Sequence, residues 1–188
     1  ASSAIDLEEH QIRVARRISH DVTPRYLLAD EVGLGKTIEA GILLRQYILD
    51  YPLEHDVVII VPQHLRAQWS YELSRLFSLR PHLKTTVRII TSEDLDELGD
   101  CESTGMLIID EAHHVTAQWS PDSPEHQAFQ TIRKLAENTP RLLLLSATPV
   151  LHNESSYFAM LHLIDPDAYP LSEQALTAFK EKLDKRQE

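Results

Sequence analysis

Two short segments carry the residues that could act on a phosphate group. The first is Asp30-Glu31-Val32-Gly33-Leu34-Gly35-Lys36-Thr37, and the second is Leu107-Ile108-Ile109-Asp110-Glu111-Ala112-His113. The first combines two closely spaced glycines with a lysine and a threonine, whereas the second places two carboxylates at the end of an apolar run. Together they predict that the chain binds and hydrolyses ATP, and neither segment would support this alone.

The glycine-containing segment is typical of a phosphate-binding loop. Gly33 and Gly35 lack Cβ atoms, so the chain can turn tightly and direct its backbone N–H groups toward an anion. A helix that begins near Lys36 would add the positive end of its dipole. We expect Lys36 to reach the β- and γ-phosphates of ATP and Thr37 to offer its hydroxyl to Mg²⁺. Asp30 stands where the usual pattern Gly-x-x-x-x-Gly-Lys-Ser/Thr has its first glycine, and the alternative is an ordinary glycine-rich turn.

The second segment is predicted to be a buried strand that ends in two acids. The run from Met106 to Ile109 is apolar throughout, as expected for a strand that is covered on both faces. Ligands of open α/β sheets bind at the carboxyl ends of the strands. We therefore expect Asp110 to hold Mg²⁺, directly or through water, and Glu111 to orient and deprotonate the attacking water. The alternative is a strand that ends in solvated acids.

The composition fits one domain without membrane segments. The chain has 188 residues, of which 43% are hydrophobic and 25% are charged, enough to bury one substantial core. A single cysteine, Cys101, excludes an intrachain disulfide and suits a reducing compartment, so we expect a cytoplasmic protein with no membrane partner. The formal net charge is −11, so any contact with nucleic acid must be local or shared with protein outside this chain.

The apolar pattern predicts strands that alternate with helices. The predicted strands cover residues 26–29, 57–61, 87–91, 106–110 and 142–145, and the predicted helices cover 7–19, 37–50, a stretch around 65–76, 123–138, 151–164 and 173–188. This alternation indicates a parallel sheet with right-handed crossovers, which is an α/β fold. We assign residues 1–170 to one lobe and residues 171–188 to a helical tail at a cut end. The six acids between residues 93 and 102 are expected to form a solvated edge without a function.

In their order, these motifs resemble the first RecA-like lobe of the superfamily-two, helicase-type ATPases of the Swi/Snf-like group. Within that group the similarity is to the bacterial RapA-type branch, whose phosphate loop normally carries an acidic pair as residues 30–31 do here. The segment 110–113 resembles the Asp-Glu-Ala-His box, 61–65 resembles motif Ia, and Ser146-Ala147-Thr148-Pro149 resembles motif III. The resemblance implies a RecA-like P-loop NTPase fold, which is a three-layer sandwich around a mainly parallel sheet.

The resemblance also implies further nucleotide-site residues. Gln11 would read the adenine base, because a carboxamide can pair with its N6/N7 edge. Ser146 and Thr148 would lie beside the phosphates and link them, through His113, to a nucleic-acid path. The alternative for Gln11 is a solvated helix residue, and the alternative for the two hydroxyl residues is a capped strand end.

Contacts with nucleic acid are implied at two loops. By this resemblance, the sugar-phosphate backbone would be touched by Pro62, Gln63 and His64 after one strand and by Thr91 and Ser92 after the next, with charge added by Arg66. Such contacts need only N–H groups and hydroxyls. The alternative is that these loops only connect and cap the strands. Trp69 lies on an apolar helical stripe, so we expect it in the core.

The function implied by the resemblance is that of the ATP-binding lobe of a double-stranded-DNA translocase or remodeller, with ATP and Mg²⁺ as cofactors. Such a motor also needs a second RecA-like lobe that supplies an arginine finger, so this lobe alone is expected to hydrolyse little ATP. One alternative is a lobe of an RNA-directed or RNA-polymerase-associated ATPase. Another is a nucleotide-gated interaction module without catalysis, against which the intact Lys36, Asp110 and Glu111 argue.

Overall fold

Five parallel strands form the centre of the molecule in a computed structural model that describes residues 9–19, 21, 24–29, 35–52, 56–83, 85–147 and 153–187. The strands are β1 (Arg25–Ala29), β2 (Val57–Val61), β3 (Val87–Thr91), β4 (Met106–Ile109) and β5 (Arg141–Ser146). They are ordered β1-β5-β4-β2-β3, and each neighbouring pair is parallel. The predicted parallel sheet is therefore confirmed, and the bounds predicted for β2 and β3 are met residue for residue.

The helices also follow the predicted order. They are α1 (Glu9–Ser19), α2 (Lys36–Asp50), α3 (Arg66–Arg75), α4 (Ala112–Thr116), α5 (His126–Glu137), α6 (Glu154–Ile164) and α7 (Glu173–Gln187), with two short 3₁₀ helices, η1 (Gln63–Leu65) and η2 (Leu95–Leu98). The sequence did not predict α4. It also started α5 three residues too early, because the residues before His126 form turns. None of the helices in the described part is long and apolar enough to cross a bilayer.

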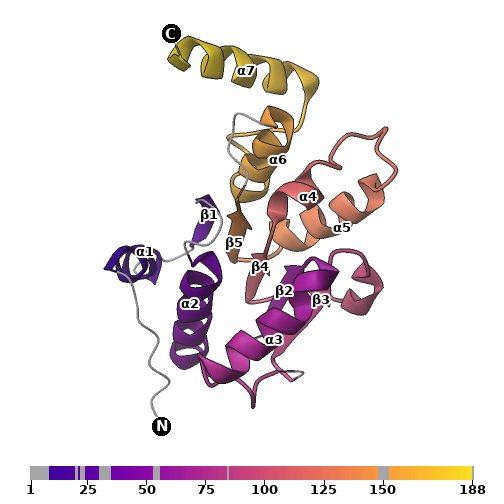
Figure 1. Cartoon of the computed structure of the whole chain (residues 1–188). Coiled ribbons are helices and arrows are strands. Elements are labelled where there is room, and N and C mark those ends of the chain that lie inside the picture. The colour runs from indigo at the N-terminus through magenta and orange to yellow at the C-terminus, as the bar shows by residue number, and fades with distance from the viewer. Residues whose placement is uncertain are drawn as a thin grey trace.

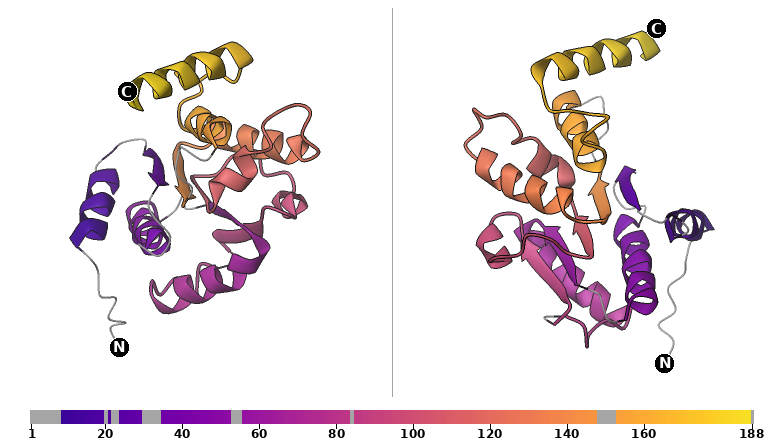
Figure 2. Two further views of the ribbon diagram at one scale, coloured as in Figure 1. Left: turned by 45° about the horizontal axis from the view of Figure 1, so that its top comes forward. Right: turned by 180° about the vertical axis from the view of Figure 1, so that it is seen from behind.

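The strands bury both faces, which explains their continuous apolar runs. All five residues of β2 are fully buried. Alternate residues belong to different cores: Val57 and Ile59 pack in the core that also holds residues of α1, α2 and α3, whereas Val58 and Ile60 pack in the core that holds residues of α4, α5 and α6. The result is a sheet between two helical layers (Figures 1 and 2).

The parallel arrangement brings the ends of the strands together at one edge of the sheet. Pro62, Ser92 and Asp110 directly follow β2, β3 and β4, and Ser146 is the last residue of β5. Helix α2 begins at Lys36, shortly after the end of β1 (Figure 1). Segments that are far apart in the sequence therefore supply one common edge, as ligand sites in such sheets require.

A close helix contact positions α2, the helix that carries Lys36. Gly41 lies against Phe77, which follows α3, and a Cβ atom added to Gly41 would come within 2.2 Å of the Phe77 ring. Only glycine therefore allows this approach without movement of a buried aromatic ring. The contact fixes α2 beside the segment that ends α3.

Helix α7, over Glu173–Gln187, matches the helix predicted for residues 173–188. It packs on α6 through aromatic rings, with the Phe179 centroid 5.3 Å from that of Phe158 and 6.4 Å from that of Tyr169. Tyr157 adds a fourth ring to this cluster. Figure 1 shows α7 extending from the end of α6, away from the sheet.

Arg25 joins the first strand to the ends of two helices. Its guanidinium donates hydrogen bonds to the carbonyl oxygens of Ala136 and Thr139 at the end of α5, and to those of Leu163 and Ile164 at the end of α6. The last carbonyl groups of a helix lack partners within the helix. One half-buried side chain therefore satisfies two helix ends at once.

We predict that Arg25→Met will lower the free energy of unfolding by about 2–4 kcal/mol, because it retains the aliphatic stem but removes the donor that these carbonyls share. Chemical denaturation monitored by circular dichroism measures the change. Arg133→Met is the matched control, since Arg133 forms only an exposed pair with Glu137 on α5, and it should cost under about 0.5 kcal/mol. Equal losses in the two variants would contradict the role given to Arg25.

Candidate functional site

The phosphate-loop side of the site is formed by the start of α2. Gly35 precedes the helix with φ 88° and ψ 27°, a left-handed conformation that favours glycine. Lys36 and Thr37 form the first turn of the helix, where backbone N–H groups have no partner within the helix. Five predicted loop residues, Asp30, Glu31, Val32, Gly33 and Leu34, lie outside the described residues.

Gln11 lies directly against this loop. A Cβ atom built on Gly35 would be 2.1 Å from Gln11 Nε2, so the carboxamide occupies the space beside the glycine. Gln11 is only 6% exposed although it lies on α1, a helix with several exposed residues. The alternative of a solvated helix residue is therefore wrong, whereas the role in reading adenine stays a prediction.

Asp110 is a buried carboxylate held by two donors. Its Oδ1 accepts a hydrogen bond from the backbone N–H of Glu111 at 2.9 Å, and its Oδ2 accepts one from Trp69 Nε1 at 2.8 Å. Trp69 is 1% exposed, so its predicted place in the core is confirmed. Sequence reasoning missed the hydrogen bond, because the two residues are 41 positions apart.

The electrostatic surroundings of Asp110 link it to the start of α2. Burial raises the pKa of Asp110 above its ordinary value. The hydrogen bonds from Trp69 and from the Glu111 N–H act in the opposite direction, as does the positive charge of Lys36, whereas the Glu111 carboxylate adds to the increase. The positive charge of Lys36, at the start of α2, therefore favours the charged form of Asp110.

Glu111 continues the site in a strained backbone conformation. Its φ of 47° and ψ of 44° are unusual for a residue with a side chain, and such strain is often found at functional sites. Glu111 Oε2 lies 3.2 Å from His113 Nδ1. The same nitrogen lies 3.1 Å from Ser146 Oγ at the end of β5. The structure thus brings together three of the predicted residues, while Thr148 lies outside the described residues.

His113 is uncharged at neutral pH. Burial lowers the pKa of His113, and the neighbouring His114 lowers it further, although Asp110 acts in the opposite direction. A neutral imidazole with its proton on Nδ1 can donate to either Glu111 or Ser146, and this tautomer is inferred from those neighbours. His113 is therefore placed to exchange partners between an acid after β4 and a hydroxyl on β5.

The short helix α4, which follows these acids, is attached to α6. Ser156 Oγ donates to the His113 carbonyl oxygen at 2.9 Å and lies 2.7 Å from Thr116 Oγ1. Trp119 Nε1 donates to Ser155 Oγ at 2.6 Å. Sequence reasoning found no role for Trp119, and no local pattern would have indicated this partner.

The two loops that the resemblance linked to nucleic acid lie side by side. Both oxygens of the Glu93 carboxylate accept from the Gln63 backbone N–H, at 3.1 and 3.2 Å, and Ser92 Oγ donates to the same carboxylate at 3.0 Å. Pro62 and His64 line a groove together with Ser92 and Glu93. Burial raises the pKa of Glu93, but the hydrogen bonds outweigh it, so the pKa lies below its ordinary value.

Thr91 and Arg66, the other two residues predicted to contact nucleic acid, are less accessible to a phosphate group. Thr91 is 1% exposed, so its hydroxyl could reach a phosphate only if the loop opened. Both nitrogens of the Arg66 fork bind Glu97, at 2.6 and 2.7 Å. The acids between residues 93 and 102 are thus not only a solvated edge, because Glu93 and Glu97 engage the predicted nucleic-acid residues.

The donor set fits a magnesium ion that is held mainly by phosphate and water. Among the described residues, no group of three or more His, Cys, Asp or Glu side chains could form a protein metal cage. Mg²⁺ in nucleotide sites takes only one or two protein ligands. Asp110 has a second lone pair on each oxygen, and Thr37 offers a hydroxyl in the first turn of α2.

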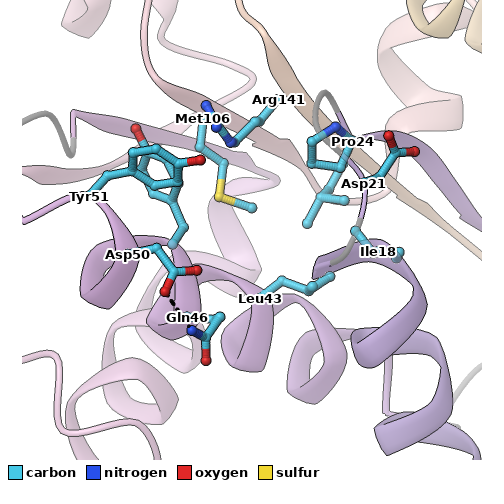
Figure 3. Close-up of a pocket in the computed structure, with 11 residues that line it drawn as sticks. Ile18, Asp21, Pro24, Leu43, Gln46, Asp50, Tyr51, Met106 and Arg141 are labelled. Carbon is cyan, nitrogen blue, oxygen red and sulfur yellow. Dashed lines mark hydrogen bonds between the residues drawn. The ribbon is translucent and has the colours of Figure 1, made fainter.

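A second hollow lies at the opposite edge of the sheet. It is lined by Met106 and Arg141, which begin β4 and β5, and by the end of α2 (Figure 3). The Arg141 guanidinium carbon lies 4.3 Å from the centre of the Tyr51 ring and 5.2 Å from that of Tyr47. Arginine–aromatic packing fills much of the space, so we assign no ligand to it.

Comparison with known proteins matches most of the chain to one family. The sequence profile described as the SNF2-related domain matches residues 10–95 and 82–187. The RNA polymerase-associated protein RapA of Yersinia enterocolitica is 39% identical over 185 residues, and that of Yersinia pestis is 40% identical over 185 residues. Each alignment covers 85% of this chain but only 19% of the relative, so the chain spans about a fifth of the length of these proteins.

A solved structure shares the fold. The SWI2/SNF2 ATPase core of Sulfolobus solfataricus, in complex with double-stranded DNA, matches with a TM-score of 0.70 and 19% sequence identity. The match covers 87% of this chain and 36% of that one. The predicted RecA-like fold is thereby confirmed. With the profile match and the RapA relatives, it follows that the chain belongs to the SNF2-related domain family.

Proposed function

We propose that this chain is the ATP-binding lobe of an ATP-dependent double-stranded-DNA translocase, and that it hydrolyses ATP to ADP and phosphate when a second lobe completes the site. The observation that carries the proposal is that Lys36 begins α2 shortly after β1 while Asp110 and Glu111 follow β4, so that all three lie at the same edge of the parallel sheet. A lysine in the first turn of a helix and two acids after a buried strand are the parts that ATP hydrolysis needs.

Each residue has a defined part in this proposal. Lys36 binds the β- and γ-phosphates, while the N–H groups at the start of α2 direct positive charge toward them. Thr37 and Asp110 hold Mg²⁺, which would neutralise charge on the phosphates when bound. Glu111 orients the attacking water and accepts its proton. His113 contacts Glu111 and, through Ser146, connects this segment to β5.

Double-stranded DNA is the proposed track. The supporting fact is that the fold neighbour is described in complex with double-stranded DNA, and Pro62, His64 and Ser92, in the loops that the resemblance links to nucleic acid, line one groove. The runner-up is an RNA-directed or RNA-polymerase-associated ATPase, which the name of the RapA relatives favours. A non-catalytic module is disfavoured, because it would not need a strained Glu111 beside His113.

The second lobe and its arginine finger are proposed to lie outside this chain. The relatives are about five times longer than the segment that the chain matches. An arginine finger contributes roughly 10³–10⁵ in rate in related phosphoryl-transfer enzymes. The isolated lobe should therefore bind ATP·Mg²⁺ weakly and turn it over slowly.

We predict that Lys36→Ala will weaken ATP·Mg²⁺ binding to this chain by about tenfold or more, because a direct phosphate partner is lost. Glu111→Gln should bind within about threefold of the unaltered chain, yet lower turnover by roughly 10²–10⁴ in a protein that carries both lobes. Calorimetric titration and phosphate release are the measurements. Lys180→Ala and Glu181→Gln, at exposed positions of α7, are matched controls. Full turnover by Glu111→Gln would remove Glu111 from its role.

We predict that Gln11→Ala will reduce the preference of the chain for ATP over GTP by about tenfold, because a carboxamide that pairs with adenine discriminates by about 1–3 kcal/mol. The readout is the ratio of two dissociation constants, so a general loss of stability does not change it. Gln46→Ala is the control, since Gln46 is exposed and pairs with Asp50 at the far end of α2. An unchanged ratio would show that Gln11 supports the loop without reading the base.

We predict that double-stranded DNA will stimulate ATP hydrolysis by the two-lobed protein at least tenfold more than RNA of equal length. The measurement is the steady-state rate at fixed ionic strength, because phosphate contacts depend steeply on salt. Single-stranded DNA provides a third arm. Equal or stronger stimulation by RNA would replace the leading proposal with the RNA-directed alternative.

A further inference from the structure

The hydrogen bond between Trp69 and Asp110 goes beyond what packing in the core requires. Trp69 is fully buried, and large apolar side chains such as Phe129 fill comparable places elsewhere in the core. An indole differs from those side chains by one polar group, the Nε1–H, which must find an acceptor when it is buried. Here that acceptor is Oδ2 of the carboxylate that the proposed function assigns to Mg²⁺.

The two hydrogen bonds of Asp110 fix the plane of its carboxylate. The backbone N–H of Glu111 holds Oδ1 from the segment that follows β4, whereas Trp69 holds Oδ2 from α3. Each oxygen keeps one further lone pair. Because the donors come from two separate elements, rotation of the carboxylate about its Cβ–Cγ bond would break at least one of them.

We propose that Trp69 is a positioning residue, whose indole N–H holds Asp110 in the orientation that binds magnesium with ATP. The proposal rests on the proposed function, since it concerns the same carboxylate. Groups that orient a metal ligand through a hydrogen bond change metal affinity by about 10–100-fold when they are removed. Trp69 itself touches neither nucleotide nor metal.

The same contact offers a spectroscopic probe. The chain has two tryptophans, Trp69 and Trp119. In a Trp119→Phe background, the remaining indole N–H gives a single signal in a ¹⁵N–¹H spectrum, and it reports on the hydrogen bond to Asp110. We expect this signal to move in Asp110→Asn, where the charged acceptor is lost. We also expect it to move on titration with Mg²⁺ and the slowly hydrolysed analogue AMP-PNP, but not with AMP-PNP in the presence of a chelator.

The decisive variant is Trp69→Phe, which retains an aromatic ring and removes the donor. We expect its apparent affinity for Mg²⁺ at saturating AMP-PNP to fall about tenfold, while its affinity for metal-free AMP-PNP stays within about twofold. A purely structural role for Trp69 would lower both affinities together. Calorimetric titration of the whole 188-residue chain measures both, and the thermal unfolding curve shows whether the variant is folded.

Two matched controls separate this role from general effects. Trp119→Phe also removes a partly buried indole N–H, but the acceptor of that N–H is Ser155 and not Asp110. Tyr71→Phe alters an exposed residue of α3 itself, which is 62% exposed. Both should retain the Mg²⁺ affinity of the unaltered chain.

The outcomes distinguish the inference from the function on which it rests. If the unaltered chain shows no magnesium-dependent nucleotide binding, the proposed function fails. If the unaltered chain binds but Trp69→Phe has the same Mg²⁺ affinity, the inference fails and the function stands. If Trp69→Phe does not fold, the indole signal decides: a signal that neither Asp110→Asn nor Mg²⁺ with AMP-PNP moves would overturn the inference.

Discussion

The burial of the Asp110 carboxylate is the constraint on which the rest of the site depends. A charged group at 8% exposure is costly unless donors and opposite charge surround it. Three elements supply them: α3 gives an indole N–H, the turn after β4 gives a backbone N–H, and α2 brings the charge of Lys36. Burial still raises the pKa of Asp110, and a positive charge placed beside the carboxylate, as Mg²⁺ would be, would favour its charged form.

The sequence was informative wherever one residue pattern determined one element. β2 could be delimited because all of its residues are apolar, and β3 because three of its five residues are β-branched and apolar; turn-forming residues follow both strands. The start of a helix near Lys36 and the strand that ends before Asp110 could be placed, because glycines precede the first and an apolar run forms the second. The prediction failed for α4, because this short helix is held in place by contacts with α6. One such contact is the hydrogen bond from Ser156 to the His113 carbonyl.

Pairings between distant segments could not be predicted from a single sequence. The pattern around Trp69 gives its burial, since Leu65, Leu73 and Leu76 share its helical stripe, but not the partner of its N–H. Likewise, nothing local indicates that the run of acids after β3 would supply Glu93 to the loop after β2. Parallel pairing brings the loops after β2 and β3 to the same edge, and the packing of α3 on the sheet brings Trp69 to Asp110. The two hydrogen bonds thus follow from the order in which strands and helices pack. A single sequence indicates that order only through its resemblance to a known family.

The charge at this edge sets a condition on the proposed nucleic-acid contacts. The Gln63 N–H and the Ser92 hydroxyl are groups that could hold a phosphate, and both already bind the Glu93 carboxylate. The pKa of Glu93 lies below its ordinary value, so the carboxylate is charged at neutral pH. A phosphate would therefore have to replace one anion with another, in a chain whose net charge is −11. This exchange gains little by itself, so the proposed binding of nucleic acid would need basic residues elsewhere to supply most of its affinity.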